Sequence, residues 1–475
     1  MDNTNRLRVC AIIEGAYPYV VGGVSIWLHQ LITNLPHIDF VLWTIVPDKD
    51  QPHRFDLPEN VVSVHELPLS RKLQNYKRKR RVNDQWKTIH DFHNKMEDGK
   101  IGRFDELYHQ FSKNGPGSLS PENLLKDFQG WELLTEKYNK NHPIMPFIDY
   151  YWSWRATHFP LFQMFQADIP KADIYHAVST GYAGLLGATA KCETGKPFIL
   201  TEHGIYAKER EIEINQSESH AGYQKRMWKN NFQSLARIAY GQADKIIALF
   251  KRNQDLQIQM GAPEARCEVI PNGIHIEQFK DLEPKKHKGF NVGYIGRMVA
   301  IKDVKNFIMA ARIAKDQIPN SHFYLIGPQE EQNEYYKELL ILVQNLDLVD
   351  SVTFTGKVDV KEYFPLLDVL CLSSIKEAQP LAVIESLIAG VPIVATHVGD
   401  VEDILREDGI IVPPKSPAKL AGGVIKFAQD AEFRTRCIQR GRQRAIVDYD
   451  LNRLIHRYSE IYNQFDSKEA VRWRA

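Results

Sequence analysis

The feature that most constrains the fold is an alternation of short apolar, β-rich runs with helical patterns, which occurs twice along the chain. In the first half the runs are "LRVCAII", "FVLWTIV", "DIYHAVS", "PFILTEHG" and "DKIIALF". After a Pro-Asn-Gly turn at 271–273 and a charged stretch, the alternation begins again with "FNVGYIGRM". Such a pattern predicts parallel sheets covered by helices. The sequence therefore predicts an α/β protein of two Rossmann-like, doubly wound domains that face each other across a cleft.

Domain bounds follow from where the pattern stops and restarts. A chain of 475 residues is longer than one hydrophobic core usually supports, so at least two domains are expected. We place the first domain at 1–285 and the second at 286–455. The segment from about 70 to 160 does not fit the alternation, because it is charged, aromatic and helical in character ("DQWKTIHDFHNKMED", "YYWSWRATHFPLFQMFQ"). It is interpreted as a helical insertion in the first domain.

Composition narrows the classes of partner and compartment. Sixty Lys and Arg residues balance 59 Asp and Glu residues, so no overall charge attracts nucleic acid. The chain has no apolar stretch of the roughly 18 residues that cross a membrane. Its five cysteines are far apart and lack metal-type spacing, which is typical of a reducing compartment. The sequence thus predicts a cytoplasmic protein with no transmembrane segment.

Two cations follow the first strand of the second domain. Arg297 comes directly after "NVGYIG", and Lys302 precedes a helix that Asp303 could cap. Positive side chains beside free N–H groups at a helix N-terminus suit a diphosphate. Solvated surface charges are the alternative. The place after the first strand of a doubly wound domain favours the phosphate site.

Two glutamates flank the start of a helix in "KEAQPLAVIESLIAGVPIVAT". Glu377 lies on the loop after the strand "VLCLSS", and Glu385 lies about one turn into the helix, so both can face the cleft. A carboxylate can accept hydrogen bonds from two sugar hydroxyls. Taken alone, Glu385 is better explained as an exposed helix position, and Glu377 as a charge favoured by the dipole at the helix N-terminus.

The first domain also carries candidate residues after its strands. Gly22 and Gly23 lie between the first strand and the first helix, where residues without a Cβ allow close approach of a phosphate or sugar; a tight turn is the alternative. His203 and Gly204 follow the strand "PFILTE". A lone histidine is more often structural, but this one opens toward the same cleft.

At this point the motifs resemble a known family. The Gly22-Gly23 pair, "TEHG", "VIPNGI", "GRMVAIKD" and "KEAQPLAVIESLIAGVPIVAT" together resemble the retaining glycosyltransferases of the GT-B fold. The hallmark of that large family is two glutamates separated by seven residues, as Glu377 and Glu385 are. The stretches "GAYPYVVGGVSIWLHQLI" and "EAQP", together with the helical insertion, are most similar to the cytoplasmic glycosyltransferases of Pel exopolysaccharide systems. The resemblance covers nearly the whole chain.

The resemblance implies roles for these residues. Arg297 and Lys302 would hold the donor diphosphate, Glu385 the ribose and Glu377 the hexose. His203 would lie near the reacting carbon, and Gly22 and Gly23 would close over the diphosphate. The backbone of the next four residues would cradle sugar and phosphate: Ala378, Gln379, Pro380 and Leu381. Many relatives have a glycine where this chain has Ala378, which leaves the hexose open. The resemblance also implies that residues 456–475 form a helix and tail that return to the first domain.

The implied reaction is transfer of a hexose from a UDP-sugar, such as UDP-glucose, to a growing exopolysaccharide or another glycan, with retention of configuration. No cofactor is expected, since the UDP-sugar is a substrate, and no metal, since two cations supply the counter-charge. A double displacement would need a carboxylate under the anomeric carbon, so front-face transfer is favoured. The partners implied are the donor, the glycan acceptor and a membrane polysaccharide-synthesis complex. The alternative is a catalytically silent subunit that binds nucleotide sugar and serves as a scaffold in such a complex.

Other motifs indicate different classes of site. Asp48 and Asp50 could hold a metal on a nucleotide diphosphate, but their place after the second strand and the competing Arg297 and Lys302 site favour solvated acids. The glycines of "STGYAGLLG" suggest a dinucleotide site, although their spacing is not the Rossmann fingerprint. The basic run 71–81 could dock on anionic lipid or an acidic partner, or be a solvated face. His90 and His93 have loose metal-type spacing but no supporting carboxylates.

Overall fold

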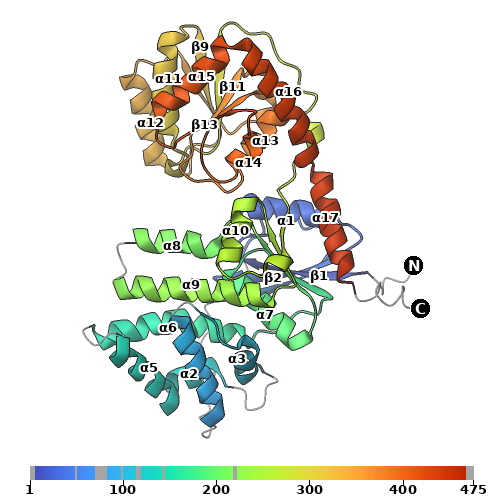
Figure 1. Cartoon of the computed structure of the whole chain (residues 1–475), viewed down its shortest axis with the longest axis vertical. Coiled ribbons are helices and arrows are strands. Elements are labelled where there is room, and N and C mark those ends of the chain that lie inside the picture. Colours follow the sequence, from blue (N-terminus) through green and yellow to red (C-terminus); the bar gives the residue numbers. More distant parts are fainter. Residues whose placement is uncertain are drawn as a thin grey trace. The chain divides into compact units, whose positions relative to one another are not determined.

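The computed structural model describes residues 6–48, 51–69, 83–97, 100–113, 119–141, 145–217 and 222–466. Asp50 and the basic run 71–81 lie outside these ranges. The chain divides into two compact units, one made of 1–270 with 457–475 and the other of 271–456 (Figure 1). Each unit is built on one parallel sheet, so the predicted α/β class with two Rossmann-like domains is confirmed.

The first unit has a seven-stranded sheet in the order β3-β2-β1-β4-β5-β6-β7, all pairs being parallel. All eight residues of β2 are buried, as expected of a parallel strand covered on both faces. The strands are β1 (Arg8–Glu14), β2 (Asp39–Val46), β3 (Val61–Pro68), β4 (Ile174–Ala177), β5 (Phe198–Glu202), β6 (Lys245–Ala248) and β7 (Cys267–Val269). The helices that accompany them are α1 (Gly23–Thr33), α7 (Gly181–Thr194), α8 (Tyr206–Gln216), α9 (Gly222–Gln242) and α10 (Lys251–Gln259).

The helical insertion of the first unit is confirmed. It packs against α7 and α9 (Figure 1). Its aromatic side chains join the same core as the sheet. Its helices are α2 (Asn83–Glu97), α3 (Phe104–Phe111), α4 (Pro121–Lys126), α5 (Phe128–Asn141) and α6 (Phe147–Met164). Throughout the residues just described, no helix combines the length and the apolar composition needed to cross a membrane.

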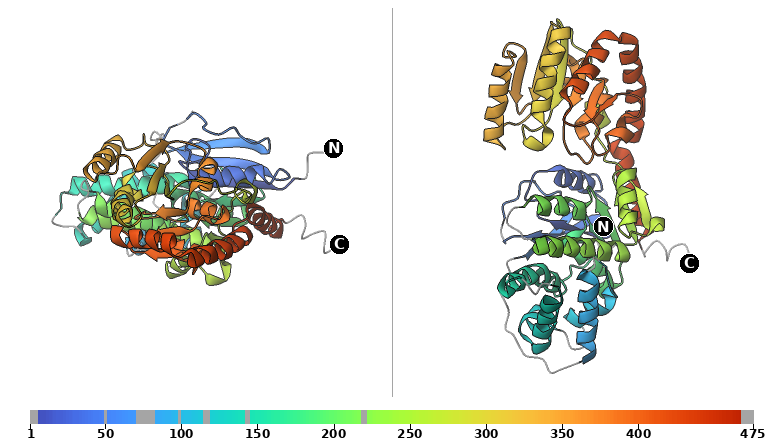
Figure 2. Two further views of the ribbon diagram at one scale, coloured as in Figure 1. Left: turned by 90° about the horizontal axis from the view of Figure 1, so that it is seen from above. Right: turned by 60° about the vertical axis from the view of Figure 1, so that its left-hand side comes forward.

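The second unit has a six-stranded parallel sheet in the order β10-β9-β8-β11-β12-β13. One core lies under α11 and α15 and another under α13 and α14, so helices cover both faces of the sheet (Figure 2). The strands are β8 (Phe290–Ile295), β9 (Ser321–Ile326), β10 (Val352–Gly356), β11 (Val369–Leu372), β12 (Ile393–Thr396) and β13 (Ile410–Val412). The helices are α11 (Val304–Gln317), α12 (Asn333–Asn345), α13 (Leu381–Ile388), α14 (Val401–Leu405), α15 (Pro417–Gln429) and α16 (Ala431–Asp448).

The structural boundary precedes the one expected at about residue 285. The second unit begins at Pro271, because the segment after the Pro-Asn-Gly turn pairs with the end of α16. The Ile274 N–H donates to the Tyr449 carbonyl over 2.8 Å, and the Leu451 N–H donates to the Ile274 carbonyl over 3.0 Å. Ile274 and Phe279 are buried in the core of the second unit. The charged stretch that follows the Pro-Asn-Gly turn is therefore a surface loop inside the second unit and not the boundary between the units.

The last helix, α17 (Leu451–Gln464), belongs to the first unit from Arg457 onward. The Tyr458 hydroxyl lies 3.0 Å from the Thr201 hydroxyl, and the Tyr462 hydroxyl lies 2.7 Å from His176 Nδ1. Both tyrosines are fully buried. The end of the described chain is therefore held in the first unit by a polar network inside an apolar core.

Candidate functional site

The candidate donor residues of the second unit gather at its topological switch point. Strands β8 and β11 are neighbours, with β9 and β10 on one side and β12 and β13 on the other. In open parallel sheets ligands bind outside the carboxyl ends of the strands at such a point. Arg297 and Lys302 follow β8, and Glu377 follows β11.

Lys302 and Glu377 are brought into direct contact. Lys302 Nζ lies 2.5 Å from Glu377 Oε1, which also accepts a hydrogen bond from the Ser374 hydroxyl over 2.6 Å. The side chains are 21% and 11% exposed, so the pair is sheltered but reachable. The Ser373 hydroxyl donates to the Lys302 carbonyl over 3.0 Å and ties the two loops together. A cation and a carboxylate are thereby held at one edge of the sheet.

Arg297 makes a different contact, which the sequence did not indicate. Its Nη1 lies 2.6 and 2.7 Å from the two carboxylate oxygens of Glu331, in the loop after β9. Both side chains are about half exposed, at 51% and 49%. Exposed ion pairs contribute little stability and exchange partners readily. A bound anion can therefore compete with Glu331 for this guanidinium.

Glu385 lies within α13 and has a desolvated carboxyl group. Burial raises its pKa to about 7, and no charged neighbour offsets that effect. Among the described residues none donates a hydrogen bond to this carboxyl, whereas Lys302 and Ser374 donate to Glu377. A desolvated acceptor of this kind is suited to hydroxyl groups brought by a ligand.

The loop that leads from Glu377 to α13, residues 377–380, is held by the Gln379 side chain and the Ala378 carbonyl. Gln379 is 8% exposed; its Oε1 accepts from the Asn272 N–H over 2.8 Å and its Nε2 donates to Asp400. The Asp400 N–H donates to the Ala378 carbonyl over 3.0 Å. Leu381 is the first residue of α13 and Pro380 is its N-cap. Asp400 and Asn272 thus fix the loop backbone at Ala378, Gln379, Pro380 and Leu381 through hydrogen bonds. The sequence alone did not indicate this role of Asp400.

The glycine pair of the first unit begins α1. Gly22 is the N-cap residue and Gly23 the first helical residue. A Cβ placed on either glycine would meet no atom within 4 Å, so neither is required by packing. The space around them in the first unit is open, as a site for a ligand needs.

His203 lies at the carboxyl end of β5. Burial lowers its pKa to about 4, so the imidazole is neutral at physiological pH. Its ring centroid lies 4.6 Å from that of Trp27 in a T-shaped contact. Its Nε2 is enclosed without a hydrogen-bond partner among the described residues. The neutral ring therefore supplies no positive charge to this part of the first unit.

The dinucleotide interpretation of "STGYAGLLG" is not supported by the geometry. The N-terminus of α7 is occupied by a carboxylate of the chain itself, because Glu14 Oε2 accepts from the Tyr182 N–H over 3.1 Å. A Cβ at Gly184 would lie 2.8 Å from the Ala239 side chain, and one at Gly187 would lie 2.1 Å from the Phe198 ring. These glycines serve close packing of α7.

The two candidate histidines are also accounted for by local contacts. His90 Nδ1 lies 3.7 Å from Glu136, and the buried His93 stacks on His158 at 4.8 Å. Asp48 is described, whereas its partner Asp50 is not. Over the described part of the chain, no group of three or more His, Cys, Asp or Glu side chains has the arrangement of a metal site.

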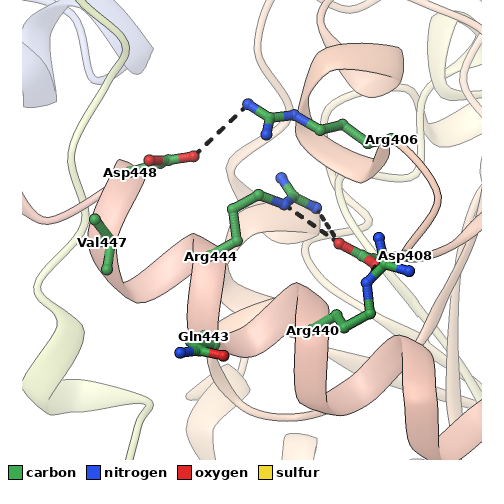
Figure 3. Close-up of a pocket in the computed structure, with 7 residues that line it drawn as sticks. All are labelled: Arg406, Asp408, Arg440, Gln443, Arg444, Val447 and Asp448. Atoms are coloured by element: carbon green, nitrogen blue, oxygen red, sulfur yellow. Dashed lines mark hydrogen bonds and ion pairs between the residues drawn. The ribbon is translucent and has the colours of Figure 1, made fainter.

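A cavity of about 520 Å³ in the second unit is lined by none of these residues (Figure 3). Each of its arginines has a carboxylate partner: Arg406 pairs with Asp448, and Arg440 and Arg444 pair with Asp408. Arg444 also donates to the Ile404 carbonyl at the end of α14. The arginines of this cavity are thus paired within the unit.

Comparison with known proteins places the chain in a family. The family model described as a domain of unknown function (DUF3492) matches residues 7–265, more than half of the chain. The chain belongs to the DUF3492 family. A second family model, glycosyl transferases group 1, matches residues 275–444 of this DUF3492 protein. The switch point with Lys302 and Glu377 lies in that second region.

One curated relative is the N-acetyl-alpha-D-glucosaminyl L-malate synthase of Bacillus anthracis, 26% identical over 173 residues, which are 36% of this chain and 44% of that protein. The chain spans about half to two thirds of the length of the first curated relatives it matches. The sucrose-phosphate synthase of Thermosynechococcus elongatus has a similar structure, with a TM-score of 0.60, 17% identity and coverage of 97% of this chain and 99% of that one.

Anabaena HepE in complex with UDP is similar as well, with a TM-score of 0.61, 15% identity and coverage of 96% and 100%. At such identities the structural likeness shows the fold. The predicted GT-B class is thereby confirmed. A further curated relative, the D-inositol 3-phosphate glycosyltransferase of Salinispora arenicola, is 23% identical over 313 residues, which are 59% of this chain and 66% of that protein, and its name agrees with the predicted glycosyltransferase class of enzyme.

Proposed function

We propose that the protein is a retaining, metal-independent glycosyltransferase that moves a hexose from a UDP-hexose, such as UDP-glucose, to a growing exopolysaccharide or another glycan. The observation that carries the proposal is the contact of Lys302 with Glu377 at the switch point of the second sheet. These are two residues of the motifs that resemble retaining enzymes, 75 positions apart in the sequence, and the fold joins them at 2.5 Å.

The donor binds to the second unit in this proposal. Glu385 accepts the ribose hydroxyls, which replace the solvation that burial has removed from its carboxyl. Arg297 and Lys302 contact the diphosphate, and Glu377 the hexose. The backbone of 378–381 lines sugar and phosphate at the start of α13, where the N-cap Pro380 makes no side-chain cap hydrogen bond. Support for UDP as the nucleotide comes from HepE, a protein of the same fold that was solved with UDP.

The reaction proceeds on one face of the sugar. The bond between the anomeric carbon and the donor phosphate breaks, and UDP leaves with the electron pair. The acceptor hydroxyl forms its bond on the same face and passes its proton to the departing phosphate oxygen. Arg297 and Lys302 stabilise the developing phosphate charge, which removes the need for a metal ion.

Glu377 orients the hexose through hydrogen bonds that persist during the transfer, so it is not a nucleophile in this proposal. His203 contributes a neutral hydrogen bond near the anomeric carbon, because burial keeps its pKa near 4. Gly22 and Gly23 contribute backbone N–H groups to the diphosphate from the first unit. We also propose a cytoplasmic location and association with a membrane polysaccharide-synthesis complex, on the motif resemblance to Pel-type enzymes.

The direct test is incubation with a panel of nucleotide sugars and detection of released nucleotide by mass spectrometry. Release from one UDP-hexose, stimulated by a glycan acceptor, is the expected result. Binding of UDP without turnover of any donor would instead favour the silent scaffold subunit. No binding of any nucleotide would contradict both functions.

Substitution of the two glutamates tests their roles separately. Glu385→Ala should weaken binding of UDP alone, because the ribose is part of that ligand. Glu377→Ala should leave UDP binding nearly intact and lower turnover. Thermal shift detects the difference, since a ligand at a hundred times its Kd stabilises by about 2.7 kcal/mol. The opposite pattern would mean that the two roles are reversed.

A further inference from the structure

The loop that carries Glu377 is held through the carboxamide of its own Gln379, which binds a backbone N–H and a carboxyl group of two other segments. Gln379 points its side chain into the second unit, where both ends of the carboxamide are bound. Its Oε1 accepts from the Asn272 N–H over 2.8 Å, and its Nε2 donates to Asp400 Oδ2. Gln379 and Asp400 are 8% and 2% exposed, so these hydrogen bonds are sheltered from water.

The carboxyl of Asp400 binds Gln379 and does not cap the helix that Asp400 precedes. Asp400 is the N-cap residue of α14, a position where an aspartate usually accepts from the helix N–H groups. Here it makes no side-chain cap hydrogen bond, and its carboxyl turns to Gln379 instead. Its own N–H donates to the Ala378 carbonyl over 3.0 Å, so backbone and side chain both hold the same loop.

The adjacent glycine shows how closely the two loops approach. Gly399 has a φ of +54°, and a Cβ on it would lie 2.2 Å from the Ala378 carbonyl oxygen and 2.7 Å from the Glu377 carbonyl oxygen. No side chain can be accommodated there without moving the loop. The backbone that presents Glu377 therefore rests directly on the loop after β12.

The other end of Gln379 reaches the turn at which the second unit begins. Asn272 lies one residue after Pro271, the first residue of that unit. Through one carboxamide, the loop of Glu377 is joined to this turn and to the loop after β12. The three segments are far apart in the sequence, and the hydrogen bonds of Gln379 fix their relative positions.

We propose that Gln379 and Asp400 are positioning residues that hold the 377–380 loop in the conformation in which Glu377 and the loop backbone meet the donor hexose. This inference rests on the proposed glycosyltransferase function. It assigns to the Gln379 side chain a role distinct from direct contact with the donor. It also adds Asp400 and Asn272, neither of which follows from the spacing of the two glutamates.

The test reverses the polarity of the pair. Gln379→Glu keeps the acceptor for Asn272 but places a second carboxyl against Asp400. The double variant Gln379→Glu/Asp400→Asn restores one donor and one acceptor in the same volume. Gln344→Glu, an exposed change of the same kind on α12, is the matched control.

The single variant should lose turnover about tenfold or more, while its Kd for UDP changes less than about threefold, because UDP keeps the ribose contact with Glu385 on α13 and the diphosphate contacts with Arg297 and Lys302. The loss should grow with rising pH, since one carboxyl of the new pair must be protonated for the two to share a hydrogen bond. Burial already raises the pKa of Asp400 to about 8, and Asp403 acts in the same direction. Tyr449 is a further titratable neighbour, whose pKa is raised by burial first and then by the carboxyl of Asp400.

The double variant should recover most of the turnover and lose the added pH dependence. A double variant no better than the single one would overturn the proposal. So would a fall in UDP affinity that matches the fall in turnover, because that pattern indicates general loss of structure. Thermal unfolding of the same set between acid and alkaline pH reports on the pair without any substrate. If the wild-type protein turned over no nucleotide sugar, the proposed function would fail, whereas the pH-dependent destabilisation and its rescue would still decide the pairing.

Discussion

Replacing Glu385 with glutamine is expected to stabilise the ligand-free protein much more at alkaline than at acidic pH. Burial raises the pKa of this carboxyl from the ordinary 4.5 to about 7. Because the pKa is higher in the folded state, the contribution of the carboxyl to stability is complete below about pH 4.5 and is lost as pH rises through about 7. Glutamine has no such ionisation, so the variant escapes the loss.

The size of the effect follows from the two pKa values. At about 1.4 kcal/mol per pKa unit, the full difference is about 3 kcal/mol. Glu385 is only partly enclosed, and solvent screening reduces the expected gain between about pH 5 and about pH 8 to about 2 kcal/mol. For a domain of the size of the second unit, that corresponds to a rise in Tm of roughly 4–8 °C.

Scanning calorimetry of the wild type and Glu385→Gln across this pH range measures the difference. Glu362→Gln, an exposed change in the same unit, controls for the loss of one charge. Saturating UDP should reverse the order, because ribose hydroxyls stabilise the ionised carboxylate of the wild type. An equal Tm difference at both pH values would show that Glu385 is not desolvated as described, and would remove the basis for its proposed role.

Three further outcomes are expected. Turnover should persist in EDTA, and its loss with recovery in Mn²⁺ would bring back the metal interpretation of Asp48. Lys302→Ala should lower kcat about a hundredfold, equivalent to about 3 kcal/mol, with the fold retained by circular dichroism; normal turnover would place the phosphate site elsewhere. Glu331→Gln should tighten UDP binding up to about fivefold in calorimetry by freeing Arg297, with Glu334→Gln as control; unchanged affinity would mean that Glu331 does not compete.

The fold could be predicted from the sequence because buried parallel strands leave a strong signal. The run that forms β2 is apolar except for Asp39 and Thr44, and the return of the pattern after 271–273 indicates a second sheet. The boundary was harder to place. Charge and turn residues suggested about residue 285, whereas pairing of Ile274 with Tyr449 extends the second unit to Pro271.

The meeting of Lys302 with Glu377 could be anticipated, since both follow neighbouring strands at one edge of a sheet. The contacts of Gln379 could not. The orientation of that side chain depends on Asp400, which lies in the loop after β12. No periodicity in the sequence predicts this orientation. The pairing of Arg297 with Glu331 is likewise a choice among surface partners that the residue types leave open.

The position of α17 has a consequence for how the protein is made. The chain leaves the first unit at Ile270 and re-enters it at Arg457, so the second unit is one continuous segment and the first is not. During synthesis from the N-terminus, the second unit can therefore finish folding before the first has received its last helix. Until that helix emerges from the ribosome, Thr201 and His176 lack their tyrosine partners, and a polar and aromatic surface that is later buried is open to chaperones. Assembly of the first unit is then expected to be the slower step, in spite of its earlier start.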